Sequence, residues 1–345
     1  MSILEAIVLA IVQGITEFLP ISSSGHLVLA GGLFDGKNLH DVSFDVAVHF
    51  GSLVAVVAYF WSDIKGVLVD WFKSLRVGHT VGHSFLGWAV IWGTVPVGLF
   101  GLVRHFSDDG QMHSAYMVSA AIIIGGALAV AGFLAMNKKQ IAKYLFYALL
   151  TMIALIITAL LLKKGIRSNV VVALTTIIFG FALWYGDAKA SHTRELDAID
   201  WKAIIIIGVA QAIAVIPGTS RSGITMAAAL LLGYKREVAA RYSFFLAIPV
   251  IILAAGSQSY KLVKSTSCVP EKGCHFVNEL GQTLPLSWMI IGLGMVVSAV
   301  VAFISIKVFL KFIERIGMMP FVIYRMVMGV IILGMIYYGV IGAGV

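Results

Sequence analysis

Residues 13–26 read QGITEFLPISSSGH, and residues 211–225 read QAIAVIPGTSRSGIT. In each stretch an apolar run meets Pro, Gly, Ser and one or two ionisable residues, after which apolar sequence resumes. Proline and glycine interrupt helices, and ionisable groups inside apolar sequence usually serve a function. We therefore expect the two stretches to decide the fold and to form one site together.

The composition of the whole chain is that of a membrane protein. Of its 345 residues, 60% are hydrophobic and 12% charged, and the mean hydropathy is +0.97. The apolar segments are long and continuous, which favours helices over the alternating strands of a barrel. The net charge of +8 comes from Lys and Arg between apolar spans, so we expect contacts with the bilayer and no nucleic-acid partner.

The predicted fold is all-α and polytopic, in a single integral membrane domain covering residues 1–345. Two segments, 3–33 and 203–233, are broken at their middle by Pro, Gly and Ser, and we interpret both as re-entrant helix-loop-helix hairpins. About eight transmembrane helices are predicted, at residues 44–61, 85–104, 114–135, 144–162, 169–186, 242–256, 287–306 and 320–342.

The two hairpins have the spacing of an internal repeat. Gln13 and Gln211 are 198 positions apart, as are Gly25 and Gly223. We therefore predict repeat 1 at about 1–104, an extra helix pair at about 114–162, and repeat 2 at about 169–345. Five crossings between the hairpins would make the repeats inverted in topology.

The distribution of basic residues predicts the orientation. Fifteen Lys and Arg fall in the loops assigned to the cytoplasm, including Lys65, Lys73 and Arg76, against eight outside. This places the first hairpin on the outer side. Cys268 and Cys274, the only two cysteines, then lie outside, where a disulfide is favoured over free thiols.

The second stretch has the features of an anion site. Gly218 and Gly223 permit unusual backbone conformations, and a helix beginning after them would direct free N–H groups at the loop. Arg221 adds a planar charged fork suited to phosphate oxygens. The alternative is an arginine that only pairs with a buried carboxylate. The expected phosphate-binding residues are Ser22 and Ser24 in the first stretch, and Gly218, Thr219, Ser220, Ser222, Gly223 and Thr225 in the second.

The first stretch supplies complementary groups. Gln13 and Glu17 share one helix face, so both can aim at a common point. Glu17 could hold a divalent cation or a water, a serine of Ser22–Ser24 could attack phosphorus, and His26 could transfer the proton. The spacing does not assign these roles, and a capped polar turn with a core histidine is the plainer alternative.

Three ionisable residues outside the two stretches have weaker assignments. Asp45 and His49 form a second i, i+4 pair, and we expect them to line the same cavity behind the residues that touch the substrate. Arg325 lies near the start of the last span, where we expect it to extend to the lipid headgroups.

At these residues the sequence resembles a known family. QGITEFLPISSSGH is similar to the (E/Q)xxxE and PxSSxGH signatures of the BacA-type undecaprenyl-diphosphate phosphatases, and PGTSRSGIT is similar to their PGxSRSxxT signature. The segments FDVAVHFGS, YSFFLAIP and PFVIYR also resemble family segments. The resemblance therefore covers both ends and most of the chain.

The resemblance implies hydrolysis of a C55 polyprenyl diphosphate to the monophosphate carrier of peptidoglycan assembly, with resistance to bacitracin. It implies a bacterial inner-membrane protein, a site reached from the periplasm, and a need for Mg²⁺ or Ca²⁺. A homodimer is left open. The family's essential residues map onto Glu17, Ser23, His26 and Arg221, with Gln13 at the first motif position.

Two points remain open from sequence alone. Family members are commonly shorter, so the helix pair at 114–162 and the cysteine loop are expected departures away from the motifs. A secondary transporter or lipid flippase is the alternative function, since such proteins share inverted repeats and broken helices. The cluster of hydroxyl, histidine and carboxylate groups favours an enzyme, with either a serine nucleophile or an activated water.

Overall fold

The computed structural model describes residues 2–23, 25, 26, 29, 42–105, 168–269, 273–277, 283–285 and 288–342. The helix pair predicted at 114–162 and the side chain of Ser24 lie outside the described residues. The other six predicted spans overlap helices, although residues 338–342 of the last one lie beyond the end of its helix and 44–61 crosses a break between two helices. The helices of the described part are α1 (Ile3–Thr16), α3 (Val42–Tyr59), α4 (Trp61–Val77), α5 (Ser84–His105), α8 (Asn169–Lys189), η3 (Leu196–Ala198), α9 (Trp201–Ile213), α10 (Arg221–Leu231), α11 (Arg236–Ser265), α12 (Trp288–Ile316) and α13 (Met319–Tyr337).

Helix length separates the elements into two groups. Four helices in the described ranges are long and apolar enough to cross a membrane: α8, residues Arg236–Tyr260 of α11, α12 and α13. α3 and α4 pass this test only as a pair, with a bend of 80° between them. α1 and α9 have 14 and 13 residues, which is about 20 Å of helix, shorter than the ~30 Å hydrocarbon core.

Polar side chains cap several helices at the expected positions. Ser2 and Glu5 form a reciprocal capping box at the start of α1, where the Glu5 N–H donates to the Ser2 hydroxyl at 3.2 Å. Ser168 caps α8 and Asp200 caps α9. These caps satisfy N–H groups that the first helical turn leaves free.

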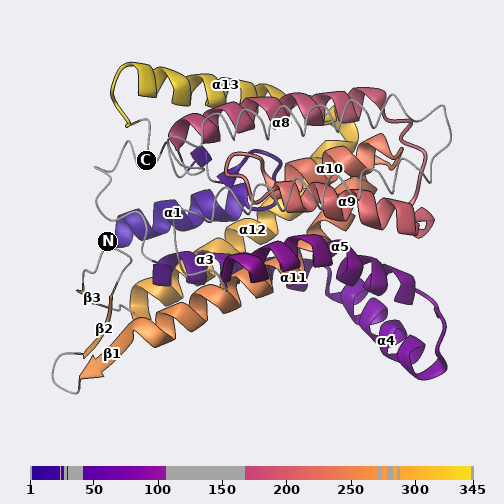
Figure 1. The fold of residues 1–345 in the computed structure, drawn as a ribbon, viewed down its shortest axis with the longest axis horizontal. Coiled ribbons are helices and arrows are strands. Elements are labelled where there is room, and N and C mark those ends of the chain that lie inside the picture. The colour runs from indigo at the N-terminus through magenta and orange to yellow at the C-terminus, as the bar shows by residue number, and fades with distance from the viewer. Residues whose placement is uncertain are drawn as a thin grey trace.

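α4 corrects the prediction that residues 62–84 form a loop. Lys65, Lys73 and Arg76 lie on this helix, which projects from the body of the molecule (Figure 1). It exposes Trp61 and Phe72 beside its charged residues, and such an amphipathic helix suits a membrane surface. Its mean hydropathy is too low for the sequence to predict it as a membrane span.

A small sheet is added to the otherwise helical fold and corrects the prediction of a polar loop around the two cysteines. Strands β1 (Thr266–Val269), β2 (Gly273–Val277) and β3 (Thr283–Pro285) pair antiparallel in sequence order at the end of α11 (Figure 1). Strands this short give little periodic signal in the sequence, so the pattern predicts only a polar loop here. Cys268 and Cys274 are paired positions in the β1–β2 register, and the disulfide itself stays a prediction.

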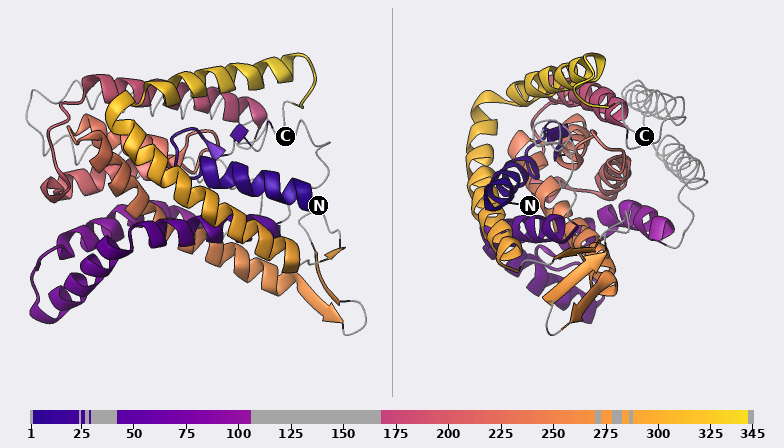
Figure 2. Two further views of the ribbon diagram at one scale, coloured as in Figure 1. Left: turned by 180° about the vertical axis from the view of Figure 1, so that it is seen from behind. Right: turned by 90° about the vertical axis from the view of Figure 1, so that its left-hand side faces the viewer.

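Close helix packing depends on small residues. In Figure 2 (left), α12, in gold, runs diagonally across the molecule beside α1. α12 also packs against α3, where a Cβ on Gly51 would lie 2.3 Å from the Met295 carbonyl oxygen. The Ser298 hydroxyl donates to the Val48 carbonyl at 2.7 Å. Small residues and interhelical hydrogen bonds of this kind stabilise helix pairs in membranes.

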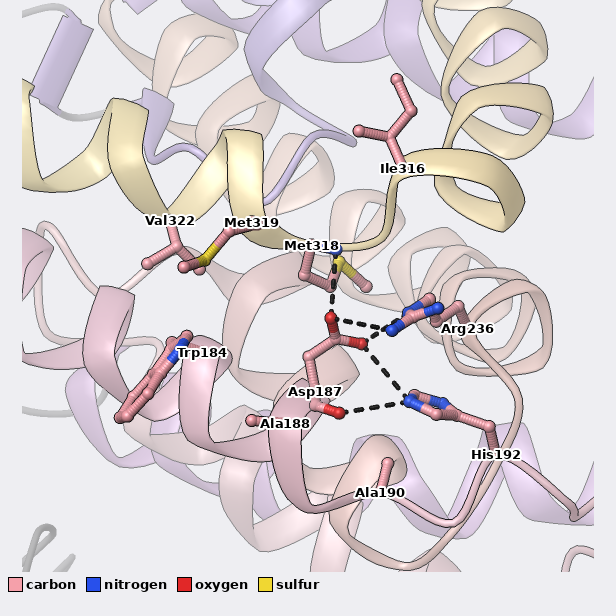
Figure 3. Close-up of a pocket in the computed structure, with 10 residues that line it drawn as sticks. All are labelled: Trp184, Asp187, Ala188, Ala190, His192, Arg236, Ile316, Met318, Met319 and Val322. Atoms are coloured by element: carbon pink, nitrogen blue, oxygen red, sulfur yellow. Dashed lines mark hydrogen bonds and ion pairs between the residues drawn. The ribbon is translucent and has the colours of Figure 1, made fainter.

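Asp187 joins three helices at the end of α8 (Figure 3). Arg236 of α11 donates from Nε to Oδ1 at 2.6 Å and from Nη2 to Oδ2 at 3.2 Å. The Met318 N–H, before α13, donates to Oδ2 at 3.2 Å. These residues border a cavity of about 390 Å³ that none of the predicted site residues lines, so we assign Asp187 a structural role.

We predict that Asp187→Ala destabilises the fold by about 3 kcal/mol, because it leaves the partly buried Arg236 without its partner. Denaturant unfolding in detergent micelles measures this change. Glu195→Ala is the control, since Glu195 pairs with Lys235 at an exposed position. This pairing raises the pKa of Lys235, but an exposed ion pair contributes little to the free energy of unfolding. Equal stability losses in both variants would contradict the prediction.

Candidate active site

The end of α1 presents two polar side chains side by side. Gln13 Nε2 donates to Glu17 Oε2 at 2.8 Å, which is the contact expected from their i, i+4 spacing. Glu17 follows the last residue of α1 and acts as its C-cap. Both side chains lie inside the protein, with 4% of Gln13 exposed and 10% of the Glu17 side chain.

The structure brings the two predicted stretches together through one ion pair. Arg221 Nη2 donates to Glu17 Oε1 at 3.1 Å, across 204 positions of sequence. His49 also approaches, with Nε2 3.9 Å from Glu17 Oε2, and its Nδ1 is 2.7 Å from the Asp45 carbonyl oxygen. Glu17 is thus contacted by Gln13, Arg221 and His49.

The loop before α10 has the tight geometry that its glycines predict. Gly218 has φ 88°, and a Cβ there would lie 2.0 Å from Thr175 Oγ1 and 2.4 Å from the Val172 carbonyl. A larger residue would be strained and would push the loop away from α8. Thr175 Oγ1 lies 2.6 Å from the Pro217 carbonyl oxygen, which holds the loop against that helix.

The two loops share one local conformation at the predicted spacing. Ser22 and Ser220, 198 positions apart, both have positive φ angles, 70° and 65°. The hydroxyl of Ser22 accepts from the Gly25 N–H at 3.4 Å, and that of Ser220 from the Gly223 N–H at 3.2 Å. Non-glycine residues seldom adopt this conformation, and such strain concentrates at functional sites.

Arg325 is buried, and the prediction that it extends to the headgroups is wrong. It is 0% exposed, and Nε donates to the Thr176 carbonyl at 3.1 Å. Nη1 donates to the carbonyl of Pro20 in the first loop at 3.3 Å. Nη2 donates to the carbonyls of Gly218 and Thr219 in the second loop at 3.0 and 2.9 Å. Loop carbonyls without helical partners attract this guanidinium inward.

The hydroxyl groups of the second stretch have mixed surroundings. Ser222 Oγ donates to the Leu19 carbonyl at 2.9 Å and so ties the two loops together. Thr225 Oγ1 lies 2.9 Å from the Arg221 carbonyl oxygen and 2.7 Å from Ser243 Oγ, so it is used inside the protein. The phosphate-binding roles predicted for these two residues stay predictions.

Within the ranges the structure describes, seven buried side-chain polar atoms have no hydrogen-bond partner. Four of them belong to the two stretches. They include Arg221 Nη1 and Thr219 Oγ1; Thr16 Oγ1 and Gln211 Oε1 are the others. Proteins rarely leave such atoms unsatisfied without a reason. The unpaired Nη1 of Arg221, beside its paired Nη2, has the properties of an anion-binding group.

His26 is held by two hydrogen bonds. Its Nδ1 lies 2.7 Å from the Ser22 carbonyl oxygen, and its Nε2 lies 2.7 Å from the hydroxyl of Tyr324 on α13. Ser23, two residues before Gly25, is only partly buried. Tyr324 is not among the predicted site residues, although it stands in PFVIYR, a segment that resembles the family.

A metal site formed by protein side chains alone does not fit these residues. No group of three or more His, Cys, Asp or Glu able to hold a metal occurs in the described part of the chain. Both oxygens of Glu17, the predicted ligand, already accept hydrogen bonds from Arg221 and Gln13. Glu17 is therefore one carboxylate ligand at most among these residues, and further ligands of a cation would have to come from outside the protein.

Comparison with known proteins assigns the family. The sequence model of the family described as bacitracin resistance protein BacA matches residues 6–143 and 130–331. The chain is 40% identical to undecaprenyl-diphosphatase 2 of Stutzerimonas stutzeri, over 96% of this chain and 98% of that relative. It is 38% identical to the undecaprenyl-diphosphatase of Saccharophagus degradans, over 98% of this chain and the whole of that relative.

The relatives also bear on the expected departures in length. Undecaprenyl-diphosphatase 1 of Pseudoalteromonas translucida is 40% identical over 96% of this chain and 97% of its own length. Because these relatives match nearly end to end, the residues at 114–162 and the cysteine segment are not peculiar to this chain. With both motifs in one site and matches along most of its length, the chain belongs to the BacA family.

Proposed function

We propose that this protein hydrolyses undecaprenyl diphosphate to undecaprenyl phosphate and inorganic phosphate. The ion pair between Arg221 and Glu17 carries the proposal, because it brings an anion-binding loop next to the carboxylate of the first stretch, which continues to Ser23 and His26. The relatives named undecaprenyl-diphosphatases support this choice of substrate.

Arg221 is the proposed anchor of the terminal phosphate. Its Nη2 is paired with Glu17 at 3.1 Å, and its buried Nη1 has no hydrogen-bond partner among the described residues. A phosphate oxygen bound beside the ion pair would satisfy Nη1. As charge shifts during reaction, the same guanidinium stabilises the transition state. The start of α10 adds a favourable dipole for the anion.

The chemistry uses groups of the first loop. Ser23, or a water in its place, attacks the terminal phosphorus, and the bond from that phosphorus to the bridging oxygen breaks. The electron pair leaves with the lipid monophosphate, whose low basicity makes it a good leaving group. His26 is the base of this step: removal of the proton from the attacking hydroxyl leaves His26 protonated. With Ser23 as nucleophile, water then hydrolyses the phosphoserine.

The Mg²⁺ or Ca²⁺ expected from the family is proposed to bind the diphosphate oxygens of the substrate. Mg²⁺ is commonly bound by one or two carboxylates together with substrate phosphates. Glu17 would be the protein carboxylate nearest to it. When bound, the ion would neutralise part of the diphosphate charge.

We further infer that the protein spans the bacterial inner membrane several times, with the site reached from the periplasm. α1 and α9 are too short to cross the bilayer, which supports two re-entrant hairpins. The shared geometry of Ser22 and Ser220 supports the repeat. The excess of Lys and Arg in the cytoplasmic loops supports the inverted orientation. The homodimer remains a separate proposal.

The proposed physiological role is recycling of the lipid carrier of peptidoglycan synthesis. Bacitracin sequesters the lipid diphosphate, so an enzyme that consumes this lipid would confer resistance. A lipid carrier without hydrolytic activity is the alternative function. Phosphate release by the purified protein from undecaprenyl diphosphate in detergent separates the two, because a carrier would release none.

We predict that Arg221→Lys lowers kcat/KM for phosphate release about 100-fold or more. Lysine keeps the positive charge but cannot contact Glu17 and a phosphate with two planar N–H groups. Arg315→Lys, at the exposed end of α12, is the matched control and should retain normal activity. Near-normal phosphate release by folded Arg221→Lys protein would contradict the role of Arg221.

Expression of the wild-type protein should raise the bacitracin concentration tolerated by a sensitive bacterial host. Glu17→Gln should not, because it preserves shape but removes the charge that pairs with Arg221. Glu5→Gln, on the same helix and within its capping box, serves as the control. Equal resistance from Glu17→Gln at equal expression would count against the assigned role of Glu17.

The orientation predicts the reactivity of Cys268 and Cys274. In spheroplasts of a bacterial host that carries the protein in its inner membrane, a membrane-impermeant maleimide should label both residues after the disulfide is reduced. Before reduction, little labelling should occur. Labelling only after membrane lysis would place the β1–β2 segment on the cytoplasmic side and reverse the proposed topology. Labelling without reduction would argue against the disulfide.

A further inference from the structure

Both ring nitrogens of His26 are occupied. The Ser22 carbonyl can only accept a hydrogen bond, so Nδ1, 2.7 Å away, carries the proton of the neutral ring. Nε2 is then an acceptor, and the Tyr324 hydroxyl, also at 2.7 Å, is its donor. The hydrogen bond made by one ring nitrogen of a histidine fixes which tautomer the ring adopts. No nitrogen of His26 is left to contact an attacking oxygen directly.

Tyr324 is held firmly beside His26. The two rings stack, with centroids 5.5 Å apart and planes inclined by 10°. Arg325, the next residue on α13, is anchored to the carbonyls of Pro20, Gly218 and Thr219. This anchor places Tyr324 where the two loops meet. Unlike Arg325, Tyr324 is 44% exposed, so its side chain is not enclosed by protein.

We propose that Tyr324 is the hydroxyl through which His26 exchanges protons with the attacking oxygen. The inference rests on the proposed phosphatase activity and adds a catalytic residue to it. It follows from the geometry: the base faces the tyrosine hydroxyl, and the tyrosine is the outer, more accessible member of the pair. An interfacial tyrosine that only anchored α13 would not need a histidine base as its partner.

The proton transfers balance in both directions. As Ser23 Oγ or water bonds to phosphorus, its proton passes to the Tyr324 oxygen, and the tyrosine proton passes to His26 Nε2. The imidazolium so formed keeps its Nδ1–H bond to the Ser22 carbonyl. When water then bonds to the phosphorus of the phosphoserine, the bond from phosphorus to Ser23 Oγ breaks, the released phosphate keeps the water's protons, and His26 returns its proton through Tyr324 to Ser23 Oγ. In the water route the proton held by His26 goes to the released phosphate.

Steady-state phosphate release from undecaprenyl diphosphate by purified variants tests the relay. Tyr324→Phe keeps the stacked ring and removes the hydroxyl, and should lower kcat by about 10- to 100-fold with little change in KM. Tyr337→Phe is the control on the same helix, since Tyr337 is 84% exposed, and should behave as wild type. A kcat for Tyr324→Phe near the wild-type value would overturn the proposal.

A double-mutant cycle tests whether Tyr324 acts through His26. In a His26→Ala background, Tyr324→Phe should cause little further loss of kcat, because the relay is already broken. Equal losses in both backgrounds would overturn the proposal and leave a purely structural tyrosine. A wild-type protein that releases no phosphate would overturn the proposed function and the relay with it.

A readout independent of activity tests the contact itself. Diethyl pyrocarbonate modifies an unprotonated imidazole nitrogen, and Nε2 of His26 is covered by the Tyr324 hydroxyl. The modification rate of His26, followed by mass spectrometry, should rise several-fold in Tyr324→Phe and stay unchanged in Tyr337→Phe. An unchanged rate in Tyr324→Phe would overturn the relay even if the wild-type protein proves to be an active phosphatase.

Discussion

The rest of the structure depends on the hydrogen bonds from the buried guanidinium of Arg325 to backbone carbonyls. Its donors reach Thr176 on α8, Pro20 in the first loop, and Gly218 and Thr219 in the second. Broken helices leave carbonyls that no helical N–H can satisfy, and inside a bilayer water cannot replace them. No ion pair with a carboxylate accompanies Arg325 in the described ranges, so the carbonyls themselves stabilise its charge.

This arrangement explains how strained loops can hold a site. A Cβ on Gly223 would lie 2.9 Å from Arg325 Nη1, so the glycine lets the guanidinium pass close to the start of α10. Ser222 adds a hydrogen bond to the Leu19 carbonyl. With the two loops fixed in this way, Glu17 and Arg221 meet at 3.1 Å. The positive φ angles of Ser22 and Ser220 persist because these surrounding contacts determine them.

Much of the fold followed from hydropathy and helix breakers, and the failures have physical causes. Long apolar runs predicted α8, α11, α12 and α13, because membrane helices must satisfy their backbone internally. α4 was missed because an amphipathic surface helix has low mean hydropathy. The strands around Cys268 and Cys274 were missed because three to five residues carry too little periodicity, and their ladder depends on a partner strand.

The sequence by itself determined the chemistry of the site. Gln13 and Glu17 share a helix face by spacing, and the glycines around Arg221 predict an anion-binding turn. Only the tertiary structure decided which groups meet. The Arg221–Glu17 pair, the inward position of Arg325 and the bond from Tyr324 to His26 join residues 106 to 305 positions apart. Such contacts arise because helices pack and because buried polar groups need hydrogen-bond partners. The local spacing of residues in the sequence predicts neither.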